Sequence, residues 1–173
     1  MRGVFKRSKE LLEQSDVLVS KTMKGKSKYY YEFDRNMTPE QSKNLIIPEL
    51  RYFKFSEFDS PDKKGSGKES MDRYFLSLID DARHEAGIPF KITSGFRTAE
   101  HNIALEQKGY KVARNSAHLK GLAVDIAAPD SKTRYKIIKA LTGQKISRIG
   151  IGKNFVHCDI DNTKTPELIW TYY

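Results

Sequence analysis

Two histidines and one aspartate stand where they could share a metal ion. His118 and Asp125 lie close together in the chain, with Gly121 between them to allow a sharp turn, and His157 follows much later. Imidazole nitrogens and carboxylate oxygens are zinc ligands, and a catalytic zinc site usually takes three protein ligands and keeps a fourth position open. The single cysteine, Cys158, argues against a closed thiolate cage. The residue types therefore predict an open metal site of the catalytic kind.

Two predicted strands would position these side chains. Residues 122–127 alternate large and small apolar residues, which places Asp125 on the face with the small ones. Residues 155–160 place His157 and Asp159 together on one face. If the two strands are neighbours, Asp125 and His157 can face each other across the ladder. His118 would then complete the site from the loop that enters the first strand.

Each of these residues also has an ordinary structural explanation. A histidine is more often a packed or exposed side chain than a ligand, and Asp125 could simply cap a helix or pair with an arginine. The other two histidines, His84 late in a predicted helix and His101 in the next one, are interpreted as structural. Spacing between distant segments does not decide between these interpretations.

The motifs resemble a known family. Residues 116–125 read S-x-H-x-x-G-x-A-x-D, residues 155–159 read F-V-H-x-D, and residues 94–98 read S-G-F-R-T. In this order they resemble the zinc D-alanyl-D-alanine carboxypeptidases and their relatives, which include D,D-dipeptidases, L-alanyl-D-glutamate endopeptidases and many phage endolysins. The resemblance covers about residues 50–170, whereas residues 1–48 have no recognised counterpart.

The resemblance implies a role for each matching residue. His118, Asp125 and His157 match the ligands of one Zn²⁺ per chain. Arg97 matches a catalytic arginine that holds the substrate carboxylate or the developing oxyanion, a task that suits a planar guanidinium. Ser116 matches a substrate-side residue that orients groups beside the metal.

The general base departs from the family pattern. Many members carry an acid three residues before the last histidine ligand, where this chain has Asn154, which cannot accept a proton. Asp159, on the same strand face as His157, is the candidate base. Its alternative role is to orient His157 by a hydrogen bond, and the sequence does not choose between the two.

The remaining pattern predicts an α+β fold with a small, mainly antiparallel sheet and flanking helices, which the resemblance identifies with the hedgehog and D,D-peptidase fold. The predicted elements are helices over 71–86, 98–107 and 131–141, strands over 90–93, 122–127, 148–151 and 155–160, and a loop over 59–67. We divide the chain into a basic N-terminal segment, 1–48, partly helical or mobile, and a zinc peptidase domain, 49–173.

Composition limits where and how such a protein works. The chain is 38% hydrophobic and 31% charged, with a net charge of +9, so a soluble, basic protein is expected. We find no signal peptide and no apolar run of bilayer length. We therefore expect synthesis in the cytoplasm and action on the cell wall after release, a setting typical of a phage lysis protein, and we expect a monomer.

Three functions compete at this point. The leading hypothesis is a zinc peptidase acting on peptidoglycan stem peptides. The second is a zinc-bearing but catalytically silent binding module, because the hedgehog signalling domain resembles the same fold. The third, a nucleic-acid-binding protein, rests on charge and on the aromatic run 29–31; we expect no specific nucleic-acid partner.

Overall fold

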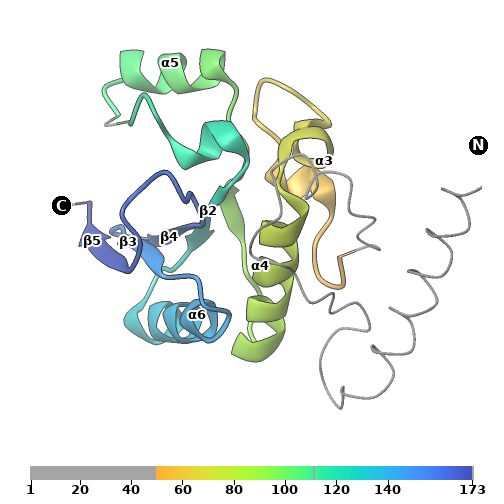
Figure 1. The fold of residues 1–173 in the computed structure, drawn as a ribbon, viewed down its shortest axis with the longest axis vertical. Coiled ribbons are helices and arrows are strands. Elements are labelled where there is room, and N and C mark those ends of the chain that lie inside the picture. Colours follow the sequence, from red (N-terminus) through yellow and green to blue (C-terminus); the bar gives the residue numbers. More distant parts are fainter. Residues whose placement is uncertain (1–49, 111, 173) are drawn as a thin grey trace, which may run out of the picture. The chain divides into compact units, whose positions relative to one another are not determined.

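A five-stranded sheet forms the centre of the computed structural model, which describes residues 50–110 and 112–172 (Figure 1). The predicted segment 1–48 lies outside the described residues. The sheet has the strand order β1-β2-β4-β3-β5. The strands are β1 (Ile92–Ser94), β2 (Ala123–Ala127), β3 (Arg148–Ile151), β4 (Phe155–Asp159) and β5 (Leu168–Thr171). The helices are η1 (Phe55–Phe58), α3 (Ser66–Ser70), α4 (Arg73–Ala86), α5 (Ala99–Gln107), η2 (Ala117–Lys120) and α6 (Ser131–Gly143).

Pairing in the sheet is antiparallel at every junction except that between β3 and β5, which is parallel. The predicted α+β class and mainly antiparallel sheet are therefore confirmed. β5 was not predicted. It extends the sheet beyond β3 and supplies an edge that the sequence pattern did not reveal.

Helix α4 has clear start and stop signals. The side chain of Asp72 accepts a hydrogen bond from the backbone N–H of Phe75 at 2.8 Å, which caps the first turn. Gly87 ends the helix in the left-handed conformation, with φ of 61°. The face between them carries fully buried side chains such as Phe75 and Ile79. Burying one such side chain contributes about 1.5–3 kcal/mol to folding.

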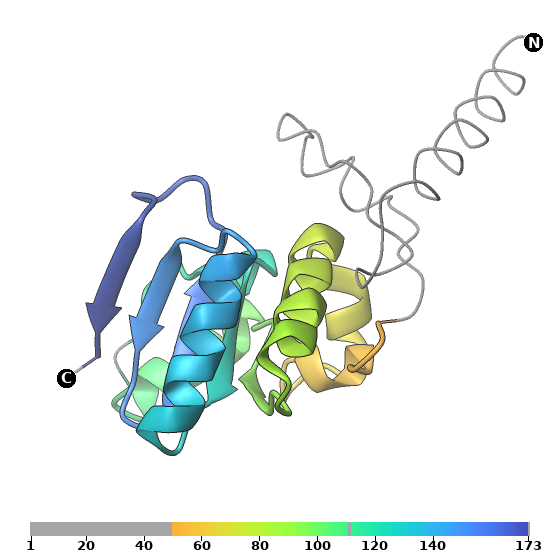
Figure 2. The same cartoon turned by 90° about the horizontal axis from the view of Figure 1, so that it is seen from below.

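The core lies between α4, α6 and one face of the sheet. Figure 2 shows α4 and α6 side by side, with α6 lying along the sheet. From the sheet, Val124 and Ile126 of β2 and Val156 and Cys158 of β4 enter this core fully buried. The alternation along each strand therefore turns Asp125 and His157 to the opposite face, where η2 and α5 lie (Figure 1).

Two local predictions need correction. The strand predicted over 90–93 occupies Ile92–Ser94, where Ile92 and Ser94 are the register partners of Ile126 and Asp125 in β2. The loop predicted over 59–67 contains the start of α3. The carboxylate of Asp59 accepts hydrogen bonds from the backbone N–H groups of Gly65 and Gly67, at 2.8 and 2.7 Å, and so folds these residues into a turn that begins the helix.

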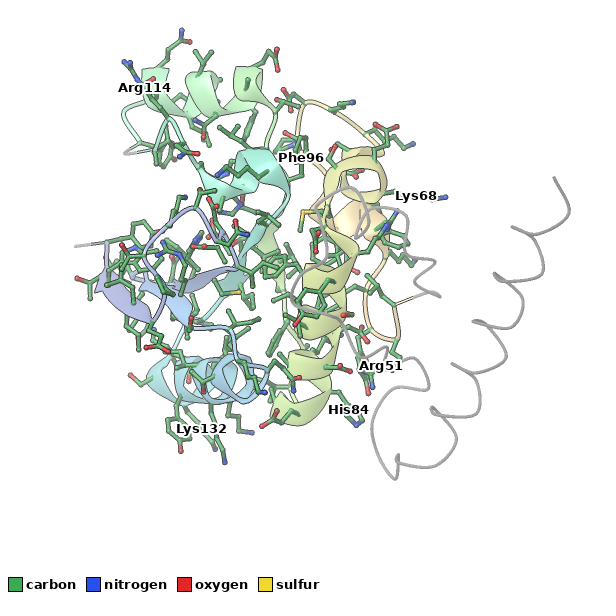
Figure 3. All side chains as sticks on the ribbon, viewed as in Figure 1. Arg51, Lys68, His84, Phe96, Arg114 and Lys132 are labelled. Carbon is green, nitrogen blue, oxygen red and sulfur yellow. The ribbon has the colours of Figure 1, made fainter. Side chains whose placement is uncertain are left out.

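Basic side chains leave the described domain in different directions. Figure 3 labels three exposed examples: Lys68 on α3, Arg114 after α5 and Lys132 on α6. These three do not share one patch, as expected of a solvated basic surface. None of the helices in the described part of the chain has both the length and the apolar composition to cross a bilayer.

Candidate metal centre

The pairing of β2 with β4 places two of the predicted ligands directly opposite each other. Asp125 and His157 are register partners, and Gly150 of β3 lies on the other side of His157. Trp170 of β5 is in turn the partner of Gly150. Directly paired residues point to the same face of a sheet. The four residues therefore form one row across the face opposite the core.

His118 reaches this row from η2. The Ser116 side chain caps η2 by accepting from the His118 N–H at 3.4 Å, and Gly121 ends it with φ of 69°. Nδ1 of His118 lies 2.7 Å from the carbonyl oxygen of Gly95. A carbonyl only accepts, so Nδ1 carries the proton and Nε2 is left free to bind a metal.

The three predicted ligands converge on one point. One ligand atom from each of His118, Asp125 and His157 lies within 4.8 Å of the other two. Oδ1 of Asp125 is 2.8 Å from Nδ1 of His157 and 3.3 Å from Nε2 of His118. The two nitrogens are themselves 3.3 Å apart. Two imidazole nitrogens and a carboxylate oxygen at this spacing fit a divalent cation such as zinc.

The pKa values of the two histidines are shifted in opposite directions. Burial is the main effect on His118 and lowers its pKa, so its ring is neutral and able to ligate. Burial also acts to lower the pKa of His157, but hydrogen bonds to Asp125 and Asp159 outweigh it and raise that pKa. The pKa of Asp125 is lowered, since both histidines offset the cost of burying its charge. The carboxylate is therefore ionised, as a metal ligand must be.

Arg97 lies on the other oxygen of the same carboxylate. Its Nη2 is 2.9 Å from Oδ2 of Asp125, and its Nε donates to Oγ of Ser94 at 2.9 Å. The backbone N–H of Arg97 donates to the carbonyl of His118 at 3.1 Å. The guanidinium is thus fixed beside the ligand set, where it could meet a substrate anion.

Comparison with known families supports this arrangement. The family model described as Peptidase M15 matches residues 51–159, more than half of the chain. The chain belongs to the Peptidase M15 family. M15 peptidases are zinc-dependent metallopeptidases that act on peptidoglycan peptides. The family that the sequence motifs resemble is therefore confirmed. A search of curated proteins found no match. The region that matches the M15 model includes every predicted ligand and ends before β5.

Asp159 lies on the side of His157 that faces away from the other ligands. Nδ1 of His157 faces Asp125, whereas Nε2 lies 3.2 Å from Oδ2 of Asp159. The other oxygen of Asp159 accepts from Nε of Arg148 and from the N–H of Asp161. The carboxylate is 1% exposed. This placement favours the role that orients His157 over the role of base.

Two further positions that the M15 resemblance singled out, Ser116 and Asn154, lie in different surroundings. Ser116 is buried and holds the start of η2, which bears His118. Asn154 is exposed in the turn between β3 and β4, and its carbonyl accepts from the N–H of Ala128. Ser116 is therefore linked to the ligand set by its hydrogen bond to the backbone N–H of His118, whereas Asn154 is exposed to solvent.

Sequence reasoning missed an aromatic group on the same face. The ring of Trp170 lies 5.5 Å from that of His157, and Tyr172 lies 6.2 Å from His157 and 5.3 Å from Phe155. A Cβ on Gly150 would lie 2.6 Å from the Tyr172 ring, so this glycine makes room for it. Burial, followed by the charge of Asp125, raises the pKa of Tyr172 to about 12. The enrichment of residues 168–172 in β-branched and aromatic side chains was the signal that could have revealed this strand.

Proposed function

We propose that residues 49–173 form a zinc peptidase that binds one Zn²⁺ and hydrolyses D-amino-acid peptide bonds in peptidoglycan stem peptides, as a D,D-carboxypeptidase or an endopeptidase. The observation that carries this proposal is the convergence of His118, Asp125 and His157 in a member of the M15 family. When bound, zinc supplies Lewis-acid polarisation of a peptide carbonyl and activation of water.

The protein's own residues prepare the site in three ways. The Gly95 carbonyl fixes the tautomer of His118. Asp159 does the equivalent for His157, holding Nε2 so that Nδ1 is directed at the site. Burial of the histidines and Asp125 excludes water, and electrostatic interactions are stronger in such surroundings.

Arg97 is the proposed substrate-binding and catalytic cation. Its side chain is anchored through Nε to Ser94 and through Nη2 to Asp125, which leaves the rest of its five-donor fork available. A peptide carboxylate or a developing oxyanion beside the metal ligands would be stabilised by it. Ser116 is proposed to support the substrate side of the site from the base of η2.

A second candidate function, zinc binding without catalysis, is favoured by two observations. Asn154 has no acidic group, and both oxygens of Asp159 already have partners. Hydrolysis needs a group that takes a proton from water and returns it to the leaving amine. If the substrate or another segment does not supply that group, the domain is a binding module.

Mass spectrometry of purified muropeptides tests the proposal. We expect the full chain, loaded with zinc, to release one defined fragment, and the fragment's mass identifies the bond that is cut. A chelator should abolish the reaction, and adding zinc should restore it. Zinc bound at one per chain with no turnover of any muropeptide would favour the binding module instead.

The biological setting is part of the same proposal. A peptidase of this size and charge suits a phage lysis protein that reaches the anionic wall after the membrane is breached. Binding of the full chain to purified cell walls at low and high salt tests it. We expect retention at low salt and release at high salt.

A further inference from the structure

A buried arginine lies behind the candidate metal centre. Arg148 begins β3 and is the register partner of Asp159 in β4. It is 9% exposed, although arginine is rarely buried unless it is paired. It lies outside the motifs over 94–98, 116–125 and 155–159.

Arg148 makes three contacts, each with a different part of the site's support. Its Nε donates to Oδ1 of Asp159 at 2.8 Å. Its Nη1 donates to the carbonyl of Thr165, in the loop that leads to β5. Its guanidinium lies 5.3 Å from the ring centroid of Trp170, within the range of a cation–π contact.

Two of those three partners also contact His157. Asp159 accepts from Nε2 of His157 at 3.2 Å, and the Trp170 ring lies 5.5 Å from the imidazole. The remaining nitrogen, Nδ1, faces Asp125 and the candidate ion position. Asp159, which holds Nε2 of His157, and Trp170, which lies beside the imidazole ring, therefore both contact the guanidinium of Arg148.

We propose that Arg148 is a positioning residue that fixes the imidazole of His157, through Asp159 and Trp170, and so sets the affinity of the site for zinc. This inference rests on the proposed zinc site. The inference extends that proposal, because it makes zinc affinity depend on residues of β3 and β5. β5 lies outside the family match. A planar guanidinium can meet a carboxylate, a carbonyl and an aromatic face together, which a lysine ammonium cannot.

Zinc affinity of the full chain, measured by competition with a chelator of known affinity, tests the inference. We expect Arg148→Met to weaken zinc binding by about a hundredfold and Arg148→Lys by about tenfold, the limits usual for groups that support a metal ligand. Arg83→Met is the matched control. Arg83 also lies over an aromatic ring, Phe53 at 4.7 Å, and donates to a backbone carbonyl, but on α4. Its loss should leave zinc affinity within about twofold of wild type.

A double-variant cycle separates positioning from general stability. If Arg148 acts through Asp159, adding Arg148→Met to Asp159→Asn should weaken zinc binding by much less than the product of the two single effects. Fully multiplicative effects would overturn the inference. Thermal unfolding in excess chelator reports any loss of stability that is independent of zinc.

The outcomes distinguish this inference from the function on which it rests. Wild-type protein that binds no zinc would overturn the proposed function itself. Wild-type protein that binds zinc, with Arg148→Met indistinguishable from Arg83→Met, would overturn only the inference. Removing Arg148 strands a buried carboxylate and could prevent folding. In that case Arg148→Lys decides, and a lysine variant with wild-type zinc affinity would overturn the inference.

Discussion

The two sides of the candidate metal centre are held by different kinds of interaction. On one side, which we call the loop flank, residues 94–97 and η2 meet mainly through backbone groups: the Gly95 carbonyl with His118, and the Arg97 N–H with the His118 carbonyl. On the other, the strand flank of β3, β4 and β5, the contacts are between side chains, chiefly Arg148, Asp159 and Trp170.

This difference determines how each flank can fail. Backbone contacts do not depend on side-chain charge, but they require close approach, so the loop flank should be sensitive to added volume. The strand flank rests on buried charged groups, so it should be sensitive to any substitution that leaves one of them without a partner. The following expectations test this contrast, from the largest effect to the smallest.

Loss of either flank's ligand should have the largest effect. We expect His118→Ala and His157→Ala each to remove zinc almost completely, because a site of three ligands becomes one of two. Elemental analysis after reconstitution and desalting measures this, with about one zinc per wild-type chain as the reference. A wild-type zinc content near zero would reject the site.

Asp159→Asn should have the next largest effect. If Asp159 orients His157, zinc affinity should fall by about 10–100-fold and excess zinc should restore the hydrolysis rate. If it is instead the base, turnover should fall by about a hundredfold or more with zinc retained. Turnover measured against zinc concentration separates the two roles, and failure of zinc to restore the rate would contradict the orienting role.

Arg97→Lys should leave the metal and weaken the chemistry. The lysine keeps the charge but not the fork, so we expect a loss of at least about tenfold in kcat/KM, equivalent to about 1.4 kcal/mol. Zinc content should be unchanged. A lysine variant with near-normal turnover would exclude Arg97 from the reaction.

Gly95→Ala tests the loop flank by volume alone. A Cβ there would lie 2.5 Å from Cα of Phe58, so the backbone must move. We expect a loss of about 1–3 kcal/mol in stability, together with weaker zinc binding because the Gly95 carbonyl shifts from His118. The control is Gly109→Ala, at a φ of +85° with nothing within 4 Å of the added atom. It should cost about 1 kcal/mol through backbone strain and leave zinc affinity unchanged.

The smallest effect concerns Asp161, which ties the loop after β4 to η2. Its carboxylate is buried and accepts from Lys120 at 3.0 Å. Burial opposes ionisation, but hydrogen bonds from Thr163 and Lys120 outweigh it and lower its pKa from 3.8 to about 2. The folded pKa is the lower one, so the stabilisation is present above about pH 4 and disappears as the pH falls toward 2.

The measurement is the thermal unfolding midpoint of wild type and Asp161→Asn in excess chelator. The difference between the two proteins should be largest above about pH 5 and should shrink steadily toward pH 2. A difference that stays constant with pH would show that the ionised carboxylate is not what stabilises this loop.

The sequence predicted the parts of the site that depend on local pattern. Period-two alternation around Asp125 and His157 placed both on one face, and β2 and β4 are indeed neighbours with these residues as partners. The predicted start of the helix over 98–107 is also confirmed, since Thr98 caps α5. Such features depend on few residues, each close to the next in the chain.

What could not be predicted depends on contacts between distant segments. β5 pairs in parallel with β3 across a connection that has no repeating pattern, so no local pattern indicated which strand it would join. Arg148 acquires its partners only once β3, β4 and β5 are in register. For Asp159 the strand face was predictable, but which edge of the imidazole it meets depends on side-chain rotation.

The sharing of Arg97 between Asp125 and an incoming anion has a thermodynamic consequence. A peptide carboxylate that draws the guanidinium from Oδ2 of Asp125 leaves that ligand with more of its negative charge for the cation. Peptide and zinc should then bind with positive linkage, each tightening the other by the same factor. Calorimetric titration of a peptide ligand into zinc-loaded and zinc-free protein would measure that factor directly.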